Sequence, residues 1–325
     1  MGLYPISFKT IYKDKIWGGE KIRSVLGKDF GNLSNCGESW EVSGVEGNIS
    51  VAENGPLQGK DLRSLIGQHQ GELIGEKVFR KYGDEFPLLI KFIDANADLS
   101  IQVHPDDELA RKRHDSNGKT EMWYVLQADP GATLISGFNQ PVDKAKYLKF
   151  FEEGRLTDLL NEEKVEKDDV YFLPAGRVHT IGKGLLIAEI QQTSDITYRI
   201  YDFDRTDAEG NKRELHVEEA LEAIDYSYYE SYRTNYKDVK NQPVEIVQSP
   251  YFHTNKLTID REEKRAYEKL DSFVILIVLE GKGAIKDGEN EYMLQQGGVY
   301  LIPASLKKIT ILPDNELKLL ETYVP

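Results

Sequence analysis

One stretch of this chain decides its fold, the segment Val165-Glu166-Lys167-Asp168-Asp169-Val170-Tyr171-Phe172-Leu173-Pro174-Ala175-Gly176. It recurs in altered form as Leu294-Gln295-Gln296-Gly297-Gly298-Val299-Tyr300-Leu301-Ile302-Pro303-Ala304-Ser305. Upstream of the two copies lies a second matching pair, Trp123-Tyr124-Val125-Leu126 and Leu276-Ile277-Val278-Leu279. Because internal similarity of this kind marks a repeated structural unit, the sequence predicts two domains of one architecture.

Short strand-like stretches separated by turns fill most of both halves, which is typical of antiparallel barrels and jelly rolls. We therefore expect a mainly β protein with two jelly-roll β-barrels and added helices in the first. The first domain is expected over 1–227. Its helical insertions, at about 56–82, 142–161 and 214–226, have apolar residues at three- and four-residue intervals. A linker over 228–243 then leads to the second domain, 244–325.

Two histidines in the first half each stand beside a turn. They lie in the segments Ile101-Gln102-Val103-His104-Pro105 and Pro174-Ala175-Gly176-Arg177-Val178-His179. Gln102 and His104 share one face of a strand, since they are two residues apart. Glu121 begins an apolar run between the two segments. Two imidazoles, a carboxylate and an amide oxygen suit zinc, with iron or manganese as alternatives.

The internal repeat indicates which half holds this metal. The second half has Lys307 and Lys308 near the position that His179 takes in the first. We therefore expect a metal site in the first domain and a second domain without metal ligands.

The charge of the chain limits its partners. Its 325 residues include 41 basic and 55 acidic side chains, a net charge of −14. This balance argues against nucleic acid or an anionic membrane as the main partner. A small anionic substrate would need a local basic pocket.

The cysteine content and the hydropathy pattern indicate a soluble cytoplasmic protein. Cys36 is the single cysteine, which excludes an internal disulfide framework. No stretch approaches the ~20 apolar residues of a membrane span, and the first residues lack an apolar run of signal-peptide length. We expect a monomer or a homodimer.

Longer motifs carry a family resemblance. The pattern Pro-x-Gly-x-x-His at 174–179 resembles the second motif of the cupin superfamily. A larger set resembles the type I mannose-6-phosphate isomerases, particularly their short bacterial form. Its members are Ile16-Trp17-Gly18-Gly19, Gly37-Glu38-Ser39-Trp40-Glu41-Val42-Ser43, Phe86-Pro87-Leu88-Leu89-Ile90-Lys91, Leu99–Asp107, Gly118–Tyr124 and Ser194–Asp202. The second domain is similar to the degenerate second cupin of that family.

The resemblance implies reversible interconversion of mannose 6-phosphate and fructose 6-phosphate, with one zinc ion per chain. The positions that match the family's metal ligands are Gln102, His104, Glu121 and His179. Arg199 matches the family's active-site arginine, whereas Ser100 and Lys119 match positions associated with the substrate phosphate. Glu189 and Asp195 fall at positions that line the family's pocket.

Aldose–ketose isomerisation moves a proton between C1 and C2 of the sugar through an enediol(ate). Zinc can polarise the sugar oxygens as a Lewis acid, and Arg199 can stabilise the developing oxyanion. A base must remove a carbon-bound proton and return it. Glu189, Lys91, Asp195 and a metal-bound water are chemically able to do this. We give Glu189 a catalytic role beside Arg199 and place Lys91 and Asp195 among the substrate-binding residues.

Two other function classes are compatible with a cupin fold. An oxygenase-type cupin would use two histidines and one carboxylate on iron, but it has no need of Lys119 and Arg199. A non-catalytic sugar-binding cupin would lack ligands, as the second half does. Oxygen consumption by an iron-loaded sample would favour the oxygenase. Binding of a phosphorylated sugar without turnover would favour the non-catalytic sugar-binding protein.

Overall fold

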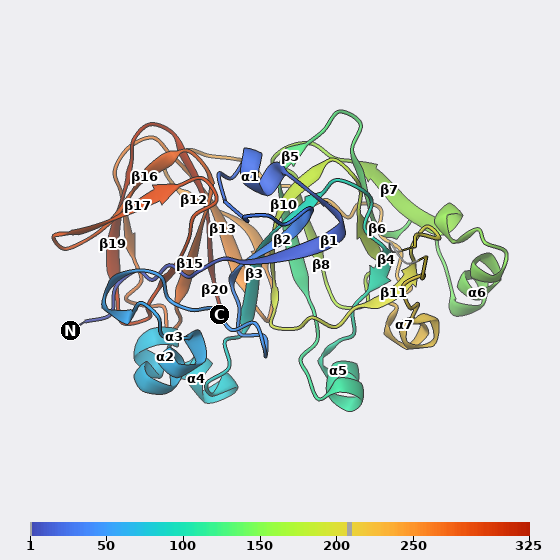
Figure 1. Ribbon diagram of the computed structural model, residues 1–325, viewed down its shortest axis with the longest axis horizontal. Coiled ribbons are helices and arrows are strands. Elements are labelled where there is room, and N and C mark those ends of the chain that lie inside the picture. Colours follow the sequence, from blue (N-terminus) through green and yellow to red (C-terminus); the bar gives the residue numbers. More distant parts are fainter. Residues whose placement is uncertain (1, 207–209) are drawn as a thin grey trace.

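The computed structural model describes residues 2–206 and 210–325. Its strands form two lobes, with the chain passing from the first to the second late in the sequence (Figure 1). Every strand pairing within the four described sheets is antiparallel. The prediction of a mainly β fold with two jelly-roll units and added helices is confirmed.

The first lobe pairs a six-stranded sheet with a five-stranded one. The larger sheet has the order β1 (Ile11–Gly19), β2 (Cys36–Val42), β3 (Leu88–Ala95), β10 (Leu185–Gln192), β5 (Glu121–Ala128) and β8 (Val170–Leu173). The smaller has the order β11 (Tyr198–Tyr201), β4 (Ile101–Val103), β9 (His179–Ile181), β6 (Thr133–Phe138) and β7 (Leu160–Lys164). Apolar side chains such as Trp123 and Leu134 form the interior of this lobe.

The second lobe repeats the plan with fewer strands. Its larger sheet has the order β12 (Pro243–Gln248), β13 (His253–Ile259), β20 (Leu317–Tyr323), β15 (Val274–Glu280) and β18 (Val299–Ile302). Its smaller sheet has the order β14 (Glu263–Ala266), β19 (Lys308–Pro313), β16 (Lys282–Asp287) and β17 (Asn290–Gln295). One apolar cluster joins the lobes, and within it the rings of Phe86 and Phe273 lie 4.7 Å apart.

The pairing of the strands shows that the two lobes are similar beyond the segments whose sequences match. Strand β20 lies between β13 and β15 as β10 lies between β3 and β5. Glu189 on β10 is opposite Trp123, and Glu321 on β20 is opposite Leu276, the residue that the repeat aligns with Trp123. The smaller sheets pair Gln102 with His179 in one lobe and Ala266 with Lys308 in the other. The second lobe therefore keeps one interior carboxylate and has Ala266 and Lys308 at the positions of the candidate ligands Gln102 and His179.

The helices lie in the three regions that the periodicity predicts and at two further places. They are α1 (Lys21–Ser24), η1 (Gly55–Leu57), α2 (Leu62–His69), α3 (Gly71–Ile74), α4 (Glu76–Tyr82), α5 (Asp107–His114), α6 (Lys144–Glu152), η2 (Leu156–Leu159) and α7 (Val217–Ala223). The region 142–161 is helical only in part. Its first helix is followed by Gly154, whose φ of 67° lies in the left-handed region that favours glycine, and strand β7 begins at Leu160. None of the helices in the described part of the chain is long and apolar enough to cross a membrane.

The first helical insertion packs against the second lobe. It is divided at Gly75, where φ is 94° and an added Cβ would lie 2.4 Å from the carbonyl oxygen of Asp271. The Asp271 carboxylate accepts hydrogen bonds from the backbone N–H groups of Glu76 and Lys77 at 2.8 and 3.1 Å. The start of α4 is thus capped by a residue from the other lobe, which fixes the insertion between the two.

Candidate active site

Two rows of side chains face each other inside the first lobe. One row crosses β11, β4 and β9, where Arg199 is opposite Gln102 and Gln102 is opposite His179. The other crosses β3, β10 and β5, where Lys91 is opposite Glu189 and Glu189 is opposite Trp123. Directly opposed residues in antiparallel strands project from the same face. Strand register alone therefore gathers these six side chains, which come from distant parts of the sequence.

His104, Glu121 and His179 form the one group of described residues with donor atoms close enough to share a metal ion. Their donor atoms all lie within 4.8 Å of one another. A Glu121 oxygen is 3.6 Å from His104 Nε2, and the other is 3.4 Å from His179 Nε2. Tetrahedral zinc with bonds of about 2.0–2.1 Å separates its ligand atoms by roughly 3.4 Å. The donor set and its spacing therefore fit zinc.

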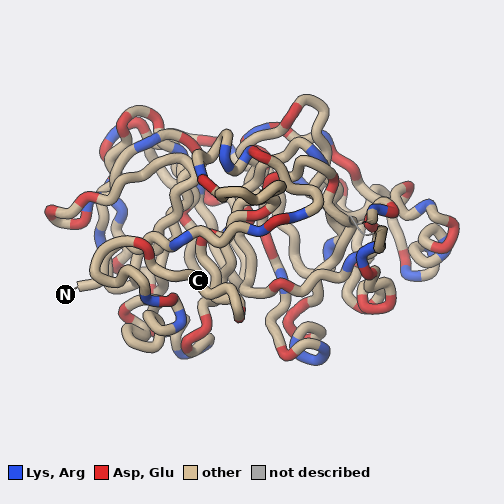
Figure 2. Tube along the Cα trace, viewed as in Figure 1, with Lys and Arg blue, Asp and Glu red and all other residues tan. Residues whose placement is uncertain are grey.

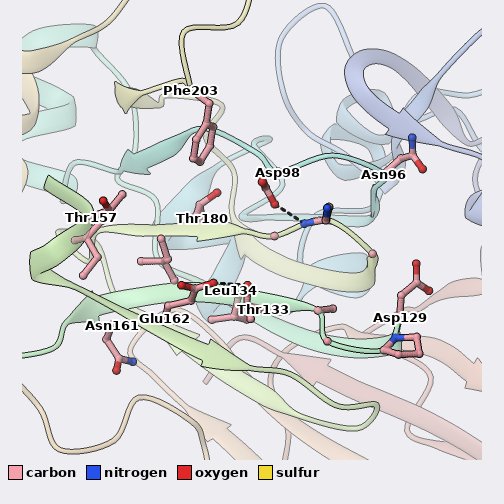
Figure 3. Close-up of a pocket in the computed structure, with 18 of the residues that line it drawn as sticks. Asn96, Asp98, Asp129, Thr133, Leu134, Thr157, Asn161, Glu162, Thr180 and Phe203 are labelled. Atoms are coloured by element: carbon pink, nitrogen blue, oxygen red, sulfur yellow. Dashed lines mark hydrogen bonds between the residues drawn. The ribbon is translucent and has the colours of Figure 1, made fainter. Parts of the chain in front are cut away.

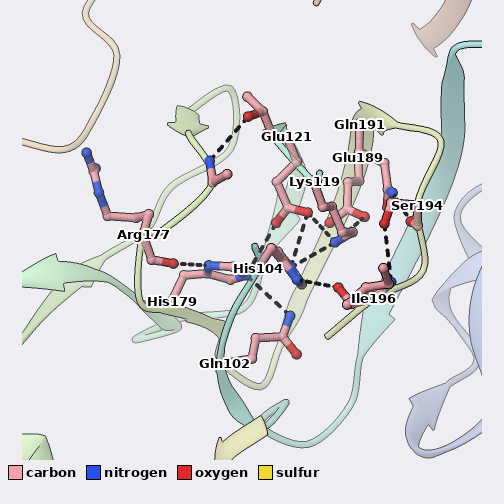
Figure 4. A network of polar contacts seen from close by, with 12 residues as sticks. Gln102, His104, Lys119, Glu121, Arg177, His179, Glu189, Gln191, Ser194 and Ile196 are labelled. Carbon is pink, nitrogen blue, oxygen red and sulfur yellow. Dashed lines mark hydrogen bonds and ion pairs between the residues drawn. The ribbon is translucent and has the colours of Figure 1, made fainter. Parts of the chain in front are cut away.

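Backbone carbonyl groups hold both imidazoles in the orientation that a metal requires. His104 Nδ1 lies 2.9 Å from the carbonyl oxygen of Ile196, and His179 Nδ1 lies 2.7 Å from that of Arg177 (Figure 4). A hydrogen bond from Nδ1–H leaves the Nε2 lone pair free as a ligand. Burial and the charge of Lys119 lower the pKa of both histidines, that of His179 to about 3, which keeps the rings neutral.

Gln102 lies at the edge of this group. Its side-chain nitrogen is 3.3 Å from His179 Nε2, and its Oε1 is 3.5 Å from the hydroxyl of Ser100. A half-turn of the amide exchanges the two ends and directs the oxygen, the atom that binds a metal, toward the histidines. The role of Gln102 as a ligand stays a prediction.

Two buried lysines lie beside the candidate ligands. Lys119 precedes β5, and its Nζ contacts Glu121, lies 2.9 Å from His104 Nε2 and lies 3.9 Å from Glu189. Lys91 is 2.8 Å from Glu189, whose other oxygen accepts a bond from the Trp123 indole at 2.7 Å. Burial alone would raise the pKa of Glu189, but the two ammonium groups outweigh it and lower the pKa to about 2. Glu189 is therefore ionised at neutral pH.

A cavity of about 300 Å³ adjoins the network of Lys91, Lys119 and Glu189. Its lining includes seven residues that the sequence singled out, Lys91, Ser100, Gln102, Lys119, Glu189, Asp195 and Arg199. His104, Glu121 and His179 do not line it and are 0 to 1% exposed. The structure thus brings all ten predicted site residues together, in two layers.

The cavity also includes residues that the sequence analysis did not single out. They are Lys15, Trp17, Glu38, Trp40, Ile93, Leu99, Thr197, Ile181 and Arg213. Glu38 and Trp40 alternate along β2 within a quoted motif, so strand alternation could have assigned them to the interior. No comparable sequence signal marks Arg213, which lies outside the strands.

The lining of this cavity is positively charged, in contrast to the chain as a whole. Residues of both signs are spread over the whole molecule (Figure 2), although acidic ones are in excess. The cavity lining reverses that balance, with Lys15, Lys91, Lys119, Arg199 and Arg213 against Glu38, Glu189 and Asp195. This is the basic pocket that an anionic substrate would need in an acidic protein.

Family models match both halves of the chain. Residues 6–127 match the catalytic domain of type I phosphomannose isomerase, and residues 244–320 match the cupin domain of mannose-6-phosphate isomerase. The chain is 36% identical to the probable mannose-6-phosphate isomerase GmuF of Bacillus subtilis over 95% of its own length and 96% of that protein's. The chain belongs to the type I phosphomannose isomerase family. A mannose-6-phosphate isomerase of Streptococcus mutans is 33% identical over 98% of both chains.

Solved structures of the family share the fold. The crystal structure of the mannose 6-phosphate isomerase from Bacillus subtilis superposes with a TM-score of 0.88 at 34% identity, over 98% of this chain and 99% of that one. Phosphomannose isomerase variants from Salmonella typhimurium reach a TM-score of 0.81 at only 16% identity. Both lobes are therefore common to members whose sequences have diverged widely.

In this member of the family, the second lobe reaches the loop that holds Lys119. The Tyr251 hydroxyl donates to one oxygen of Asp107 at 3.0 Å. The other Asp107 oxygen accepts from the Gly118 N–H at 2.9 Å and from the Gln192 amide, also at 2.9 Å. Gln192 in turn accepts from the N–H of Thr120 at 2.9 Å. Gly118 and Thr120, the residues on either side of Lys119, are therefore held in place by hydrogen bonds that lead to Asp107.

A larger cavity lies elsewhere in the first lobe. It measures about 770 Å³ and lies against β6, β7 and β9, lined by Thr133, Asn161, Glu162, Thr180 and Phe203 among others (Figure 3). None of the ten predicted site residues lines it. Size alone would therefore favour this cavity, whereas the chemistry of the lining residues favours the smaller one as the candidate site.

Proposed function

We propose that this chain is a zinc-dependent isomerase that interconverts mannose 6-phosphate and fructose 6-phosphate through an enediol(ate) intermediate. One observation carries the proposal: in a member of this family, a buried His–Glu–His group adjoins a cation-rich cavity large enough for a sugar phosphate. One zinc ion per chain would be held by His104, Glu121 and His179, with Gln102 as a fourth ligand. Zinc bound there would supply Lewis acidity toward the sugar oxygens.

The chain's own residues would bind the sugar and move the proton. Arg199, which stays charged at any working pH, would stabilise negative charge that develops on the sugar oxygens. We assign proton transfer to Glu189, because its ionised carboxylate lines the cavity and is held in place by Lys91 and Trp123. Lys91, Lys119, Ser100 and Asp195 would position the substrate. Lys91, Lys119 and Glu189 are buried, which limits the access of water to their charged groups.

A coupled assay of mannose 6-phosphate conversion, with metal analysis of the same sample, tests this function. We expect turnover in the zinc-loaded protein, loss of turnover on chelation and recovery with added zinc. An active protein with no bound metal would refute the metal dependence, and a zinc-loaded protein without turnover would refute the isomerase activity.

The role of Glu189 is tested separately. Glu189→Gln keeps the size of the side chain and one acceptor oxygen but cannot accept a proton at neutral pH. We expect it to retain zinc and to lose roughly 10²–10⁴-fold in kcat, the range of general acid–base catalysis. A kcat near the wild-type value would move the assignment to Asp195, the other predicted carboxylate of the lining.

We also infer that the enzyme is a cytoplasmic monomer or homodimer. The lone Cys36 is buried, and burial raises the pKa of its thiol to about 12, as expected of a packing residue. Light scattering of the purified protein would determine its oligomeric state.

A further inference from the structure

The cavity of about 770 Å³ is separate from the candidate active site, since the two cavities share no lining residue. His179 of the candidate metal group and Thr180 of this cavity are neighbours on β9, so their side chains project from opposite faces of the strand. The volume lies within the range of roughly 300–1,000 Å³ that is usual for ligand sites. We propose that this cavity binds a neutral saccharide. Such binding does not depend on the isomerase activity proposed above.

The polar side chains of the lining leave hydrogen-bond acceptors unused. The amide nitrogens of Asn139 and Asn161 each donate to two oxygens of the protein, which leaves both amide oxygens as acceptors. Asp98 and Glu162 each use one carboxylate oxygen to accept a bond of 2.7 Å from the protein. Among the described residues, no donor contacts the second oxygen of either carboxylate or either amide oxygen. These oxygens are therefore available to a ligand.

The same lining also offers donors. The side chains of Asn96, Thr157 and Lys183 make no hydrogen bond or ion pair with any other residue that the structure describes. A hydroxyl group both donates and accepts, so a molecule with many hydroxyl groups can pair with both kinds of partner. The composition of the lining therefore favours a polyhydroxylated ligand over an apolar one.

The charge of the lining selects against an anion. Asp98, Asp129 and Glu162 are acidic, whereas Lys183 is the single basic residue among those that line the cavity. Asp129 is paired with Lys21 at 2.9 Å, which still leaves an excess of negative charge. A phosphorylated sugar would be repelled here, in contrast to the candidate active site. The three carboxylates are also not among the described groups with donor atoms close enough to share a metal ion.

An exposed aromatic ring borders the cavity. Phe203 is 37% exposed and lies on the opposite side of the cavity from Asn161 (Figure 3). The face of an aromatic ring carries partial negative charge, which attracts the C–H groups on the face of a sugar ring. A sugar presents such a face together with hydroxyl groups around its edge. The ring and the polar side chains of the lining therefore match its two kinds of surface.

Phe203 is held in place before any ligand binds. Its φ of 55° lies in the left-handed region, which is uncommon for a bulky residue. The guanidinium of Arg205 contacts the Asp202 carboxylate and the Asp98 carbonyl oxygen, which fixes this turn. That guanidinium lies 5.5 Å from the centre of the Phe203 ring, and the Tyr201 ring lies 5.2 Å from it. Backbone strain of this kind occurs at ligand sites, and a fixed ring loses little entropy on binding.

Isothermal titration calorimetry of the intact chain with cellobiose, maltose and mannobiose tests the proposal. We expect saturable binding of at least one of these neutral disaccharides. Excess mannose 6-phosphate should change its Kd less than ~2-fold, because the acidic lining repels that anion. Phe203→Ala should raise the Kd ~5–10-fold, the effect of losing one ring contact. Glu162→Ala should raise it ~3–10-fold through the loss of an acceptor.

Tyr228→Ala and Glu291→Ala are matched controls. Tyr228 is an aromatic residue of similar exposure, 43%, and Glu291 is an exposed glutamate on β17; neither lines the cavity. The Kd of both should stay within ~2-fold of wild type. Thermal melts verify that each variant folds, and if Phe203→Ala does not, Glu162→Ala decides.

Three results would overturn the proposal. They are the absence of saturable binding with all three disaccharides, competition by mannose 6-phosphate, and an equal Kd in a folded cavity variant and its matched control. None of these measurements requires isomerase turnover, so they remain decisive if the proposed function fails.

Discussion

The interior carboxylate of the second lobe offers a sharp prediction. Glu321 is 2% exposed at its side chain and accepts two bonds from Arg265, Nε to Oε1 at 2.9 Å and Nη2 to Oε2 at 2.8 Å. Tyr267 and Asn255 donate to it at 2.7 and 3.1 Å. Glu321→Gln keeps the shape, but it places amide hydrogens against donors and leaves the guanidinium without its main counter-charge.

The magnitude follows from the burial of the pair. Breaking a buried ion pair by removing one partner costs about 3–5 kcal/mol. Arg265 is 16% exposed and also lies 3.4 Å from Glu263, which is 19% exposed, so the lower end applies. A loss of about 3 kcal/mol corresponds to a fall in Tm of roughly 4–5 °C for a chain of this size. Activity at 25 °C should be unchanged, because Glu321 lies in the other lobe.

Thermal melts followed by circular dichroism, with a parallel activity assay, measure both effects. Glu263→Gln is the matched control, since it removes the more exposed carboxylate partner of the same arginine, and its cost should be below ~1 kcal/mol. Adding Arg265→Met to Glu321→Gln should restore most of the lost Tm, because the unpaired charge is then gone. A Glu321→Gln protein that melts within ~1–2 °C of wild type would refute the reasoning.

Three further predictions concern the metal, the contact between the lobes, and pH. His179→Ala should weaken zinc binding more than ~100-fold in a chelator competition, and near-normal affinity would remove it from the ligand set. Tyr251→Phe should lower kcat/KM ~3–10-fold, because it removes a hydrogen bond that holds Asp107. The control Tyr236→Phe loses a hydrogen bond of 2.7 Å to the Asp168 carbonyl oxygen and should leave kcat/KM unchanged. Equal effects would refute the link between the second lobe and the Lys119 loop. Burial raises the pKa of Asp202, but its arginine partners outweigh this and hold it below the ordinary value. The ionised carboxylate therefore stabilises the fold fully above about pH 4, and this stabilisation is lost as the pH falls further. Between about pH 5 and pH 3, the Tm of Asp202→Asn should therefore fall less than the Tm of the wild type. An equal fall in both proteins would contradict this.

The fold was largely predictable because its signals are local and repeated. The match of 165–176 with 294–305 required only a comparison of the chain with itself, and the periodicity of the insertions required only neighbouring residues. The early end of the helix region at 142–161 was missed because Gly154 and the start of β7 at Leu160 interrupt an apolar spacing that looks continuous in sequence.

The site was predictable where motifs surround its residues. Lys119 illustrates the limit, because a motif marked it as a substrate-binding residue, whereas the structure places it just before β5 with its ammonium group against the candidate ligand Glu121. Arg213 could not be found, because its place in the cavity depends on an ion pair with Asp202, eleven residues earlier. Contacts of this kind follow from tertiary packing and leave no pattern along the chain.

The carbonyl contacts of His104 and His179 have a consequence for how this site can change by mutation. Their partners are the main-chain oxygens of Ile196 and Arg177, which exist whatever side chain stands there. A survey of single substitutions at these two positions would therefore find that each ring keeps its hydrogen-bond partner, although Arg177 itself is buried and packs against Tyr229 and Tyr232. The orientation of the two imidazoles therefore depends on the path of the backbone, so these neighbouring side chains can change while the hydrogen bonds that orient the candidate metal ligands stay the same.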